Sequence, residues 1–560
     1  MKSIYYIMLV SMILAFSCTS DFDEINQEPG VLHPEEAASG RYYLTNPEYK
    51  LFAPDRFPYW RGPLLHGDRY AGHFTTGFDG CWWTGELGYS YDAAYTDATW
   101  DWLAGYVRYI DEYLDLTVKG GVLENEKMYA VGLILRGLYY QKYSDIFGEV
   151  PYSEAGVVDI LSPKFDTHRE IYAGVIQELN TAMEIIGDAT TTGEALQDLG
   201  ENDLYYGGDL QKWKKLANTL KLRMALRALG AEGADFADAA IKEALNNPLV
   251  ELPEESALLK KDNVIDQFTS AVYGDVWHNF GLGSNWTVSK HLIDFLRDNG
   301  DPRLQKYAAP AIGGVCLMPK PSSAAEQKAV DLMLSNLDDA GVIYTRKDTT
   351  VSGESKINIR MASNTYYVGQ PARLNITSFY FANYNFFSIP SERIIMPKNS
   401  GDIFPEIILA AGEAYFLRAE AAVRGYGGDA NALFQEGIRQ SMLLWEVEDA
   451  AISDYIANSA MATLTGTDEE MLEKINTQRW VADYTDGFEA WAVVRKSGYP
   501  THVAAGVDDP EIYGFGELNG AYPQRMRYGS NEVSTNGNNL QEALSRQGAD
   551  LQSTTLWWAK

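Results

Sequence analysis

Cysteine is nearly absent from this chain, which has 560 residues and only Cys18, Cys81 and Cys316. Three such widely spaced cysteines form neither a disulfide framework nor the paired spacing of a structural zinc site. We therefore expect Cys81 and Cys316 to be buried thiols rather than partners in a disulfide.

Basic residues are also scarce, with 46 Lys and Arg against 77 Asp and Glu and a formal net charge of −31. Proteins that bind nucleic acids need a basic surface to neutralise phosphates. The charge balance therefore excludes nucleic acid as a partner, and the acidity is typical of a protein kept in solution by its charge.

Motifs for catalysis are missing as well. The sequence has no phosphate-binding loop, no nucleophile elbow and no His-Glu-x-x-His zinc motif, and its seven histidines show no ligand spacing. We predict that the protein is not an enzyme and holds no metal or cofactor. A glycoside hydrolase with an unrecognised carboxylate pair stays a weaker alternative, because 77 acidic residues produce such pairs by chance.

The only long apolar run is at the N-terminus, in "MKSIYYIMLVSMILAFSC". It is too short to cross a bilayer comfortably, but it fits the apolar part of a secretory signal after the basic Lys2. A cysteine at the expected cleavage point indicates a lipoprotein signal over residues 1–17, with Cys18 as the lipidated residue. An ordinary cleaved signal is the alternative. Residues 18–40 are polar and acidic and read as a flexible tether.

Helical periodicity dominates the remainder of the chain. Leu103, Tyr106 and Ile110 begin an apolar stripe at helical spacing, and similar stripes predict helices over about 100–230 and 405–500. Within the second region, small and apolar residues match the spacing of a tetratricopeptide helix pair. These residues are Leu417, Ala421, Ala430, Phe434 and Gly437.

Residues 252–397 break this pattern, because Gly, Pro, Asn and Ser are frequent there. We predict a loop-rich portion with short helices and few strands. The stretch "TSFYFANYNFFSIP" favours a strand, and "SNWTVSKHLIDFLRDNGDPR" favours a short helix that ends in an Asp-Pro turn.

Aromatic residues are abundant, and a few of them follow no helical or strand period. Trp102 stands on a helical stripe and is expected to pack, whereas Trp82, Trp83, Tyr89 and Tyr91 alternate with Gly and Ser. Exposed aromatic faces among polar groups suit the stacking of sugar rings. A second set comprises Tyr273, Trp277 and Trp286. We predict that both sets contact a ligand.

Several longer motifs, in this order, resemble the SusD/RagB family of nutrient-binding outer-membrane lipoproteins, in particular its SusD-like branch. They are "CTSDFDEIN", "YYQKYSDIFGEVPYSEA", "GGDLQKWKKLANTLKLRMALR", "PEIILAAGEAYFLRAEAAVRG" and "INTQRWVADYTDGFEAWAVVRKSGYP". The resemblance implies one mostly α-helical domain over residues 41–560. Tetratricopeptide-like helical pairs would form its scaffold, and the loop-rich portion would carry the ligand site.

The same resemblance implies a function. Such proteins are lipid-anchored at the cell surface in the outer membrane, where they cap a SusC-like TonB-dependent transporter. They capture oligosaccharides, or peptides in the RagB branch, and pass them to the transporter without chemical change. Ligand residues do not transfer by position within the family, so the seven aromatic candidates rest on the loop argument alone.

Overall fold

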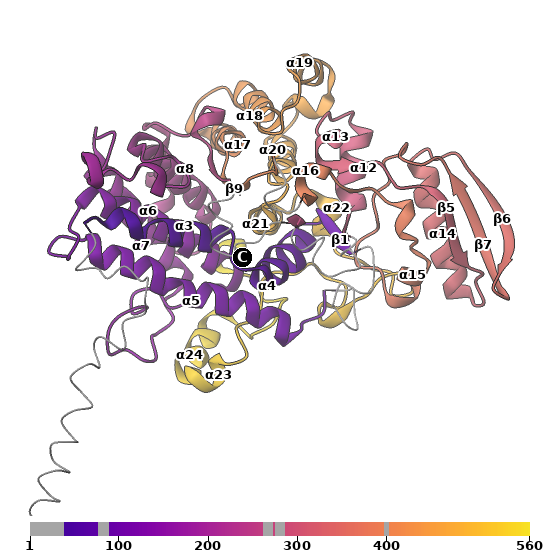
Figure 1. Cartoon of the computed structure of the whole chain (residues 1–560), viewed down its shortest axis with the longest axis horizontal. Helices are drawn as coiled ribbons and strands as arrows, with labels where there is room; N and C mark the ends of the chain where they lie inside the picture. The colour runs from indigo at the N-terminus through magenta and orange to yellow at the C-terminus, as the bar shows by residue number, and fades with distance from the viewer. Residues whose placement is uncertain (1–37, 77–88, 261–272, 275–285, 397–401) are drawn as a thin grey trace, which may run out of the picture.

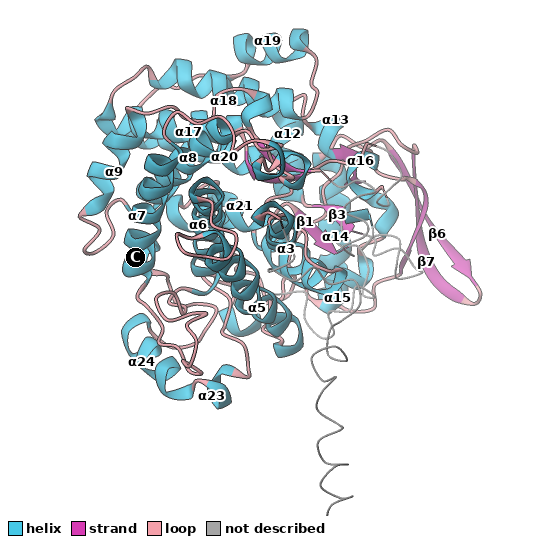
Figure 2. Cartoon of the chain, turned by 60° about the vertical axis from the view of Figure 1, so that its left-hand side comes forward, coloured by secondary structure: helices cyan, strands magenta, loops and turns pink. Residues whose placement is uncertain are grey.

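The computed structural model of this chain describes residues 38–76, 89–260, 273–274, 286–396 and 402–560. These residues are mostly helical with a few short strands, which confirms the predicted fold class (Figure 2). Cys316 is a buried free thiol. The predicted signal peptide, Cys18 and Cys81 lie outside the described residues. Across the described ranges, we find no helix with the length and apolar character that spanning a membrane requires.

The N-terminal half is a succession of packed helices, as predicted. The first long helix begins at Ala93, seven residues before the expected start, because the Asp92 side chain caps it by accepting a hydrogen bond from the Tyr95 N–H. Trp102 is half-buried and packs against the core, as predicted, and Trp100 in the same helix is buried. Neighbours along the chain contact each other in order. The helices are α5 (Ala93–Thr117), α6 (Glu126–Phe147), α7 (His168–Ile186), α8 (Leu210–Ala228) and α9 (Phe236–Leu245).

A second group of helices forms the predicted C-terminal helix pair and its neighbours. Gly437 faces Phe416 across this pair, and a Cβ atom on the glycine would lie only 2.6 Å from the phenylalanine ring. The glycine therefore lets the two helices approach closely, as its position in the tetratricopeptide spacing predicts. The helices are α17 (Ala411–Ala421), α18 (Ala430–Leu444), α19 (Asp449–Asn458), α20 (Asp468–Ala482) and α21 (Gly487–Ser497).

Buried charges connect the two groups of helices. Glu489 of α21 accepts hydrogen bonds from Arg227 of α8 and from Arg479 of α20, the latter at 2.8 Å. Burial favours the neutral acid, but Arg227, Arg223 and Arg479 outweigh it and lower the pKa of Glu489 to about 2. The carboxylate is thus ionised and matched inside the protein, and it joins helices far apart in the sequence.

The central portion contains more regular structure than the sequence predicts. A three-stranded antiparallel sheet covers α14 (Ala324–Asp339) and encloses its own small core, at the right edge of Figure 1. Buried and exposed residues alternate along β5, as in a half-buried strand. The strand order is β5 (Gly314–Pro319), β7 (Glu354–Met361) and β6 (Tyr344–Val351).

The strand predicted for "TSFYFANYNFFSIP" is mostly wrong, because α15 (Ile376–Phe381) occupies its first half. The Asn375 side chain caps this helix by accepting a hydrogen bond from the Ser378 N–H. The short helix predicted within "SNWTVSKHLIDFLRDNGDPR" is confirmed as α12 (Lys290–Asp298).

The remaining elements are short and connect these parts. Paired strands are β1 (Phe74–Thr76) with β3 (Trp286–Val288), β2 (Ala257–Leu259) with β9 (Glu406–Leu409), and β4 (Ala308–Ala309) with β8 (Ile389–Pro390). The helices are α3 (Thr45–Phe52), α4 (Arg56–Tyr59), η2 (Trp60–Asp68), α13 (Leu304–Tyr307), α16 (Glu392–Ile395), α22 (Thr501–Ala504), α23 (Glu532–Thr535) and α24 (Gly537–Gln547). Further single turns are η1 (Gly40–Tyr43), η3 (Ala195–Gln197), η4 (Gly200–Asn202), η5 (Pro253–Glu255), η6 (Tyr384–Phe386), η7 (Ala422–Tyr426), η8 (Ala460–Ala462), η9 (Gly516–Leu518) and η10 (Trp557–Ala559).

Candidate functional site

Three of the predicted stacking residues, Trp82, Trp83 and Trp277, lie outside the described residues. The described strands nevertheless relate the two segments that carry them. The chain enters residues 77–88 from Thr76, and it leaves residues 275–285 at Trp286. Thr76 and Trp286 are register partners in the β1–β3 pair. The two aromatic segments are therefore attached to the described structure at adjacent points.

Two further candidates, Tyr89 and Trp286, have buried rings, with 4% and 3% of their surface exposed. The Tyr89 hydroxyl donates a hydrogen bond to the Arg69 carbonyl oxygen at 2.6 Å, and the Arg373 guanidinium lies 4.6 Å from the Tyr89 ring centroid. Both rings are packing residues in this structure. Either could stack on a ligand only after its surroundings rearranged.

The last two candidates, Tyr91 and Tyr273, are half-buried. Arg527 lies 4.1 Å from the ring centroid of Tyr91, and the Tyr273 hydroxyl donates a hydrogen bond to Asp68 at 2.8 Å. Tyr91 contacts the C-terminal segment, whereas Tyr273 packs against Phe74 of β1. The described candidates therefore do not form one continuous aromatic surface.

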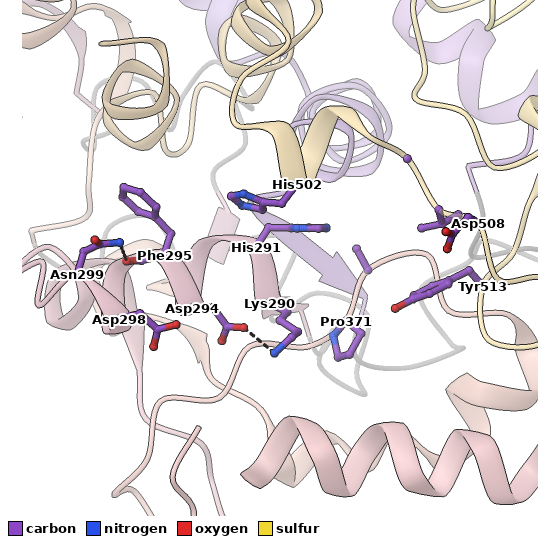
Figure 3. A pocket seen from close by; sticks show the side chains of 13 residues that line it. Lys290, His291, Asp294, Phe295, Asp298, Asn299, Pro371, His502, Asp508 and Tyr513 are labelled. Carbon is purple, nitrogen blue, oxygen red and sulfur yellow. Dashed lines mark hydrogen bonds and ion pairs between the residues drawn. The ribbon is translucent and has the colours of Figure 1, made fainter. Parts of the chain in front are cut away.

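A cleft beside these strands was not predicted from the sequence. Two cavities of about 570 and 560 Å³ adjoin along α12 and α22, and both are lined by Phe295, Asn299 and His502. We call this paired cavity the α12 cleft; Figure 3 shows the first of its two halves. Each half is within the usual size of a small-molecule site.

The sequence of α12 explains how this cleft is formed. Leu292, Ile293 and Leu296 are buried and attach the helix to the core. The opposite face presents polar groups and one aromatic ring to the cleft, at positions one turn apart. These residues are His291, Asp294, Phe295 and Asp298. An aromatic residue on the polar face of an amphipathic helix was the sequence signal for this site.

Two histidines meet at the centre of the α12 cleft. The imidazole ring of His502, which is exposed, lies over the ring of half-buried His291 (Figure 3). Burial, followed by the nearby His502 and Lys290, lowers the pKa of His291 to about 3. His291 is therefore neutral at ordinary pH, and the ring pair offers a flat surface with hydrogen-bonding nitrogen atoms.

Charged groups of the cleft are partly matched and partly open. Lys290 pairs with Asp294 at 2.6 Å. Asp508 at one end and Glu473 at the other have no ion-pair partner among the residues that the structure describes. The cleft therefore combines aromatic faces, amides and carboxylates that can accept hydrogen bonds from hydroxyl or amine groups.

The cleft does not have the makeup of a metal centre. Across the described ranges, no three His, Cys, Asp or Glu side chains are grouped so that they could hold a metal ion. Flat rings surrounded by hydrogen-bonding groups are instead suited to a ligand with both apolar faces and polar edges.

The structure therefore defines a helical protein whose scaffold of helical pairs adjoins a cleft and a short-strand module. The family model described as "Starch-binding associating with outer membrane" matches residues 68–316 and 326–529. The chain therefore belongs to the SusD-like family, which confirms the resemblance found in its sequence. The comparison with curated protein sequences yields no match.

Solved structures share the fold at low sequence identity. A chitin-binding SusD homologue from Flavobacterium johnsoniae is 21% identical, with a TM-score of 0.69 over 94% of this chain and 99% of that chain. A SusD homologue from Bacteroides uniformis is 22% identical, with a TM-score of 0.67 over 94% of this chain and 100% of that chain. A SusD-like protein from Bacteroides thetaiotaomicron is 22% identical, with a TM-score of 0.66 over 93% of this chain and 98% of that chain.

Proposed function

We propose that this chain is a lipid-anchored protein of the cell surface that captures oligosaccharides and delivers them to a SusC-like TonB-dependent transporter. The observation that carries the glycan class is the family match over most of the chain, since the family is described as starch-binding and associating with the outer membrane. A chitin-binding neighbour of the same fold supports the same ligand class. The protein would bind its ligand without chemical change.

We place a ligand contact in the α12 cleft. Its two cavities share His502 and Phe295, so a ligand that extends through both would pass over these rings. An oligosaccharide fits this arrangement, because its rings can stack on aromatic faces while its hydroxyl groups bond to amides and carboxylates. The stacking roles of Trp82, Trp83, Tyr89, Tyr91, Tyr273, Trp277 and Trp286 stay predictions.

A peptide ligand is the second candidate, and the open carboxylates of Asp508 and Glu473 favour it in one form. They would attract the cationic groups of a basic peptide. The formal net charge of −31 would add to this attraction at low ionic strength.

Calorimetric titration of the purified protein with oligosaccharides of starch and chitin, and with acidic and basic peptides, tests the proposal. We expect saturable binding of at least one glycan series and no conversion of it. If the protein bound peptides and no glycan, its ligand would be a peptide, the second candidate. Turnover of a glycan that disappears on replacing a single Asp or Glu would instead make the protein a hydrolase and contradict the binding-only function.

A further inference from the structure

Apolar side chains are concentrated at the tip of the loop between α6 and α7. Val157, Val158, Ile160 and Leu161 are all exposed, and Val158 and Leu161 have 84% and 94% of their surface accessible. Single exposed apolar residues are ordinary, but four within five positions form a patch of the kind found at interaction sites. We call residues 157–161 the apolar knob.

The knob is a defined turn with a carboxylate at its centre. The Ile160 N–H donates a hydrogen bond to the Val157 carbonyl oxygen at 3.2 Å, and Asp159 in the third position has a φ of +76°. Turns of this kind favour glycine at that position, because a side chain is strained there. The chain thus keeps a carboxylate between two apolar pairs at some cost in stability.

Hydrogen bonds on both sides hold the loop that carries the knob. On one side, the Asp166 carboxylate accepts bonds from the Ser153 N–H and the Tyr152 N–H at 2.8 and 3.0 Å. On the other, the side chain of Asn536 before α24 donates to the Pro163 carbonyl oxygen at 2.7 Å. The apolar residues are therefore presented to solvent in a preorganised conformation, which lowers the entropy cost of binding.

The knob lies near the point where the chain enters the described structure. A side chain on Gly156, at the base of the knob, would overlap Asp111 of α5, and one on Gly40 would lie 2.7 Å from Thr117 of the same helix. Asp111 and Thr117 are six residues apart, which corresponds to about 9 Å along the axis of α5. The base of the knob and Gly40 therefore contact the same helix at points about 9 Å apart. Figure 1 shows α5 on the lower side of the molecule, next to α23 and α24.

We propose that the apolar knob docks into an apolar groove of a membrane-resident protein, with a basic group of that protein facing Asp159. This inference rests on the proposed function, in which that membrane-resident partner is the SusC-like transporter. Ala38 follows Cys18 by twenty positions, so a lipid at Cys18 would keep Ala38, where the described structure begins, within about 70 Å of the membrane. Such a tether raises the effective concentration of a partner in the same membrane.

A protein groove fits these observations better than a lipid surface. The Asp159 carboxylate lies between the two apolar pairs, so insertion of both pairs into a bilayer would bury a charge. The formal net charge of −31 also opposes approach to anionic lipids. A groove in a protein can supply a cation where the carboxylate needs one.

The test measures the Kd between the full chain and its cognate TonB-dependent transporter, both purified in detergent. We expect the double variant Val158→Ser with Leu161→Ser to bind at least about 10-fold more weakly, since buried apolar anchors carry most of an interface's energy. Asp159→Gly relaxes the turn and removes the charge, and we expect it to bind several-fold more weakly. Neither variant should lower the melting temperature or change the glycan affinity, and relief of the strained turn should raise the melting temperature of Asp159→Gly slightly.

The matched control is Ile343→Ser with Tyr380→Ser, which changes two other exposed apolar residues beside the three-stranded sheet at the opposite end of the molecule. Unchanged transporter affinity in the knob variant, or an equal loss in the control, would overturn the proposal. Flotation with phosphatidylcholine–phosphatidylglycerol vesicles that requires Val158 and Leu161 would also overturn it, in favour of lipid. A wild-type protein that binds glycan but no transporter would overturn both the proposed partner and the docking site, and leave the glycan function standing.

Discussion

The imidazole ring of His502 stacks on that of His291, with ring centroids 5.2 Å apart and ring planes inclined by 27°. This contact joins α22 to α12 inside the α12 cleft. His502 is exposed and lines both cavities, so it is the side chain through which ligand binding can be tested with least disturbance of the fold.

We expect His502→Ala to weaken oligosaccharide binding by about 10-fold, the equivalent of about 1.4 kcal/mol. The exposed ring supplies a stacking face and a nitrogen atom that the alanine lacks. Calorimetric titration measures the loss, and the melting temperature should change by no more than a few degrees. Tyr42→Ala, which removes another exposed ring, is the control and should bind as the wild type does. Equal affinities of His502→Ala and wild type would remove the α12 cleft from the ligand site.

Replacement of Glu489 by Gln should destabilise the fold strongly. The change removes one of the two carboxylates that pair with each of Arg227 and Arg479 inside the protein. Arg227 keeps its pair with Asp145, and Arg479 keeps its pair with Glu413. Loss of one partner from a buried ion pair typically costs about 3–5 kcal/mol. Urea unfolding measures the change in the free energy of unfolding. Glu354→Gln breaks an ion pair with Lys356 at the surface and should alter the free energy of unfolding far less, because water and salt screen exposed charges. If the two variants lost similar amounts of unfolding free energy, the buried charges around Glu489 would not stabilise the fold as described.

Two glycines inside helices should respond to alanine in opposite directions. Gly437→Ala pushes a methyl group into the ring of Phe416 and should destabilise the protein by about 1–3 kcal/mol. Gly105→Ala in α5 meets nothing within 4 Å and should stabilise it by up to about 1 kcal/mol, since alanine favours the helix. Thermal unfolding of both variants gives the sign of each effect. A stabilising Gly437→Ala would mean that α17 and α18 are not in close contact.

Acid should weaken the fold partly through His73. Burial lowers the pKa of His73 to about 3, although its Nε2–H donates a hydrogen bond to the Trp480 carbonyl oxygen at 2.9 Å. Between about pH 6.5 and 3, the unfolded chain therefore binds a proton at this residue that the folded chain does not. The contribution to the free energy of unfolding falls as the pH falls, by up to about 1.4 kcal/mol per pH unit.

Urea unfolding at several pH values, compared between wild type and His73→Gln, checks this expectation. The variant cannot titrate at this position, so its stability should fall less steeply below pH 6.5. If the free energy of unfolding fell equally steeply with pH in wild type and variant, His73 would bind protons equally in the folded and unfolded states.

Local sequence signals were sufficient for most helices. The stripe that contains Leu103, Tyr106 and Ile110 predicts α5, because one face of a helix must be apolar to pack against its neighbours. The start of the same helix was misplaced, since its first two turns carry no large aliphatic residue and the Asp92 cap was overlooked. The hairpin of β6 and β7 was missed because β6 is largely exposed and shows no apolar alternation.

The candidate site was less accessible to such reasoning. Tyr89 follows no period in the sequence, yet the structure buries it against Tyr70 and Arg373, both contributed by other parts of the chain. The lack of a helical or strand period around Tyr89 therefore did not indicate that its side chain is exposed. The cleft residues Phe295 and His502 were not recognised, because neither forms a motif with its neighbours in sequence.

By itself, the sequence determined the helical class, the acidic net charge and the family, since each depends on composition, periodicity or ordered motifs within short segments. Only the tertiary structure decided which aromatic rings are buried and where a cleft opens. Burial depends on contacts between segments far apart in the chain, such as His291 with His502. A side chain that has no local reason to be inside or outside is placed by those contacts alone.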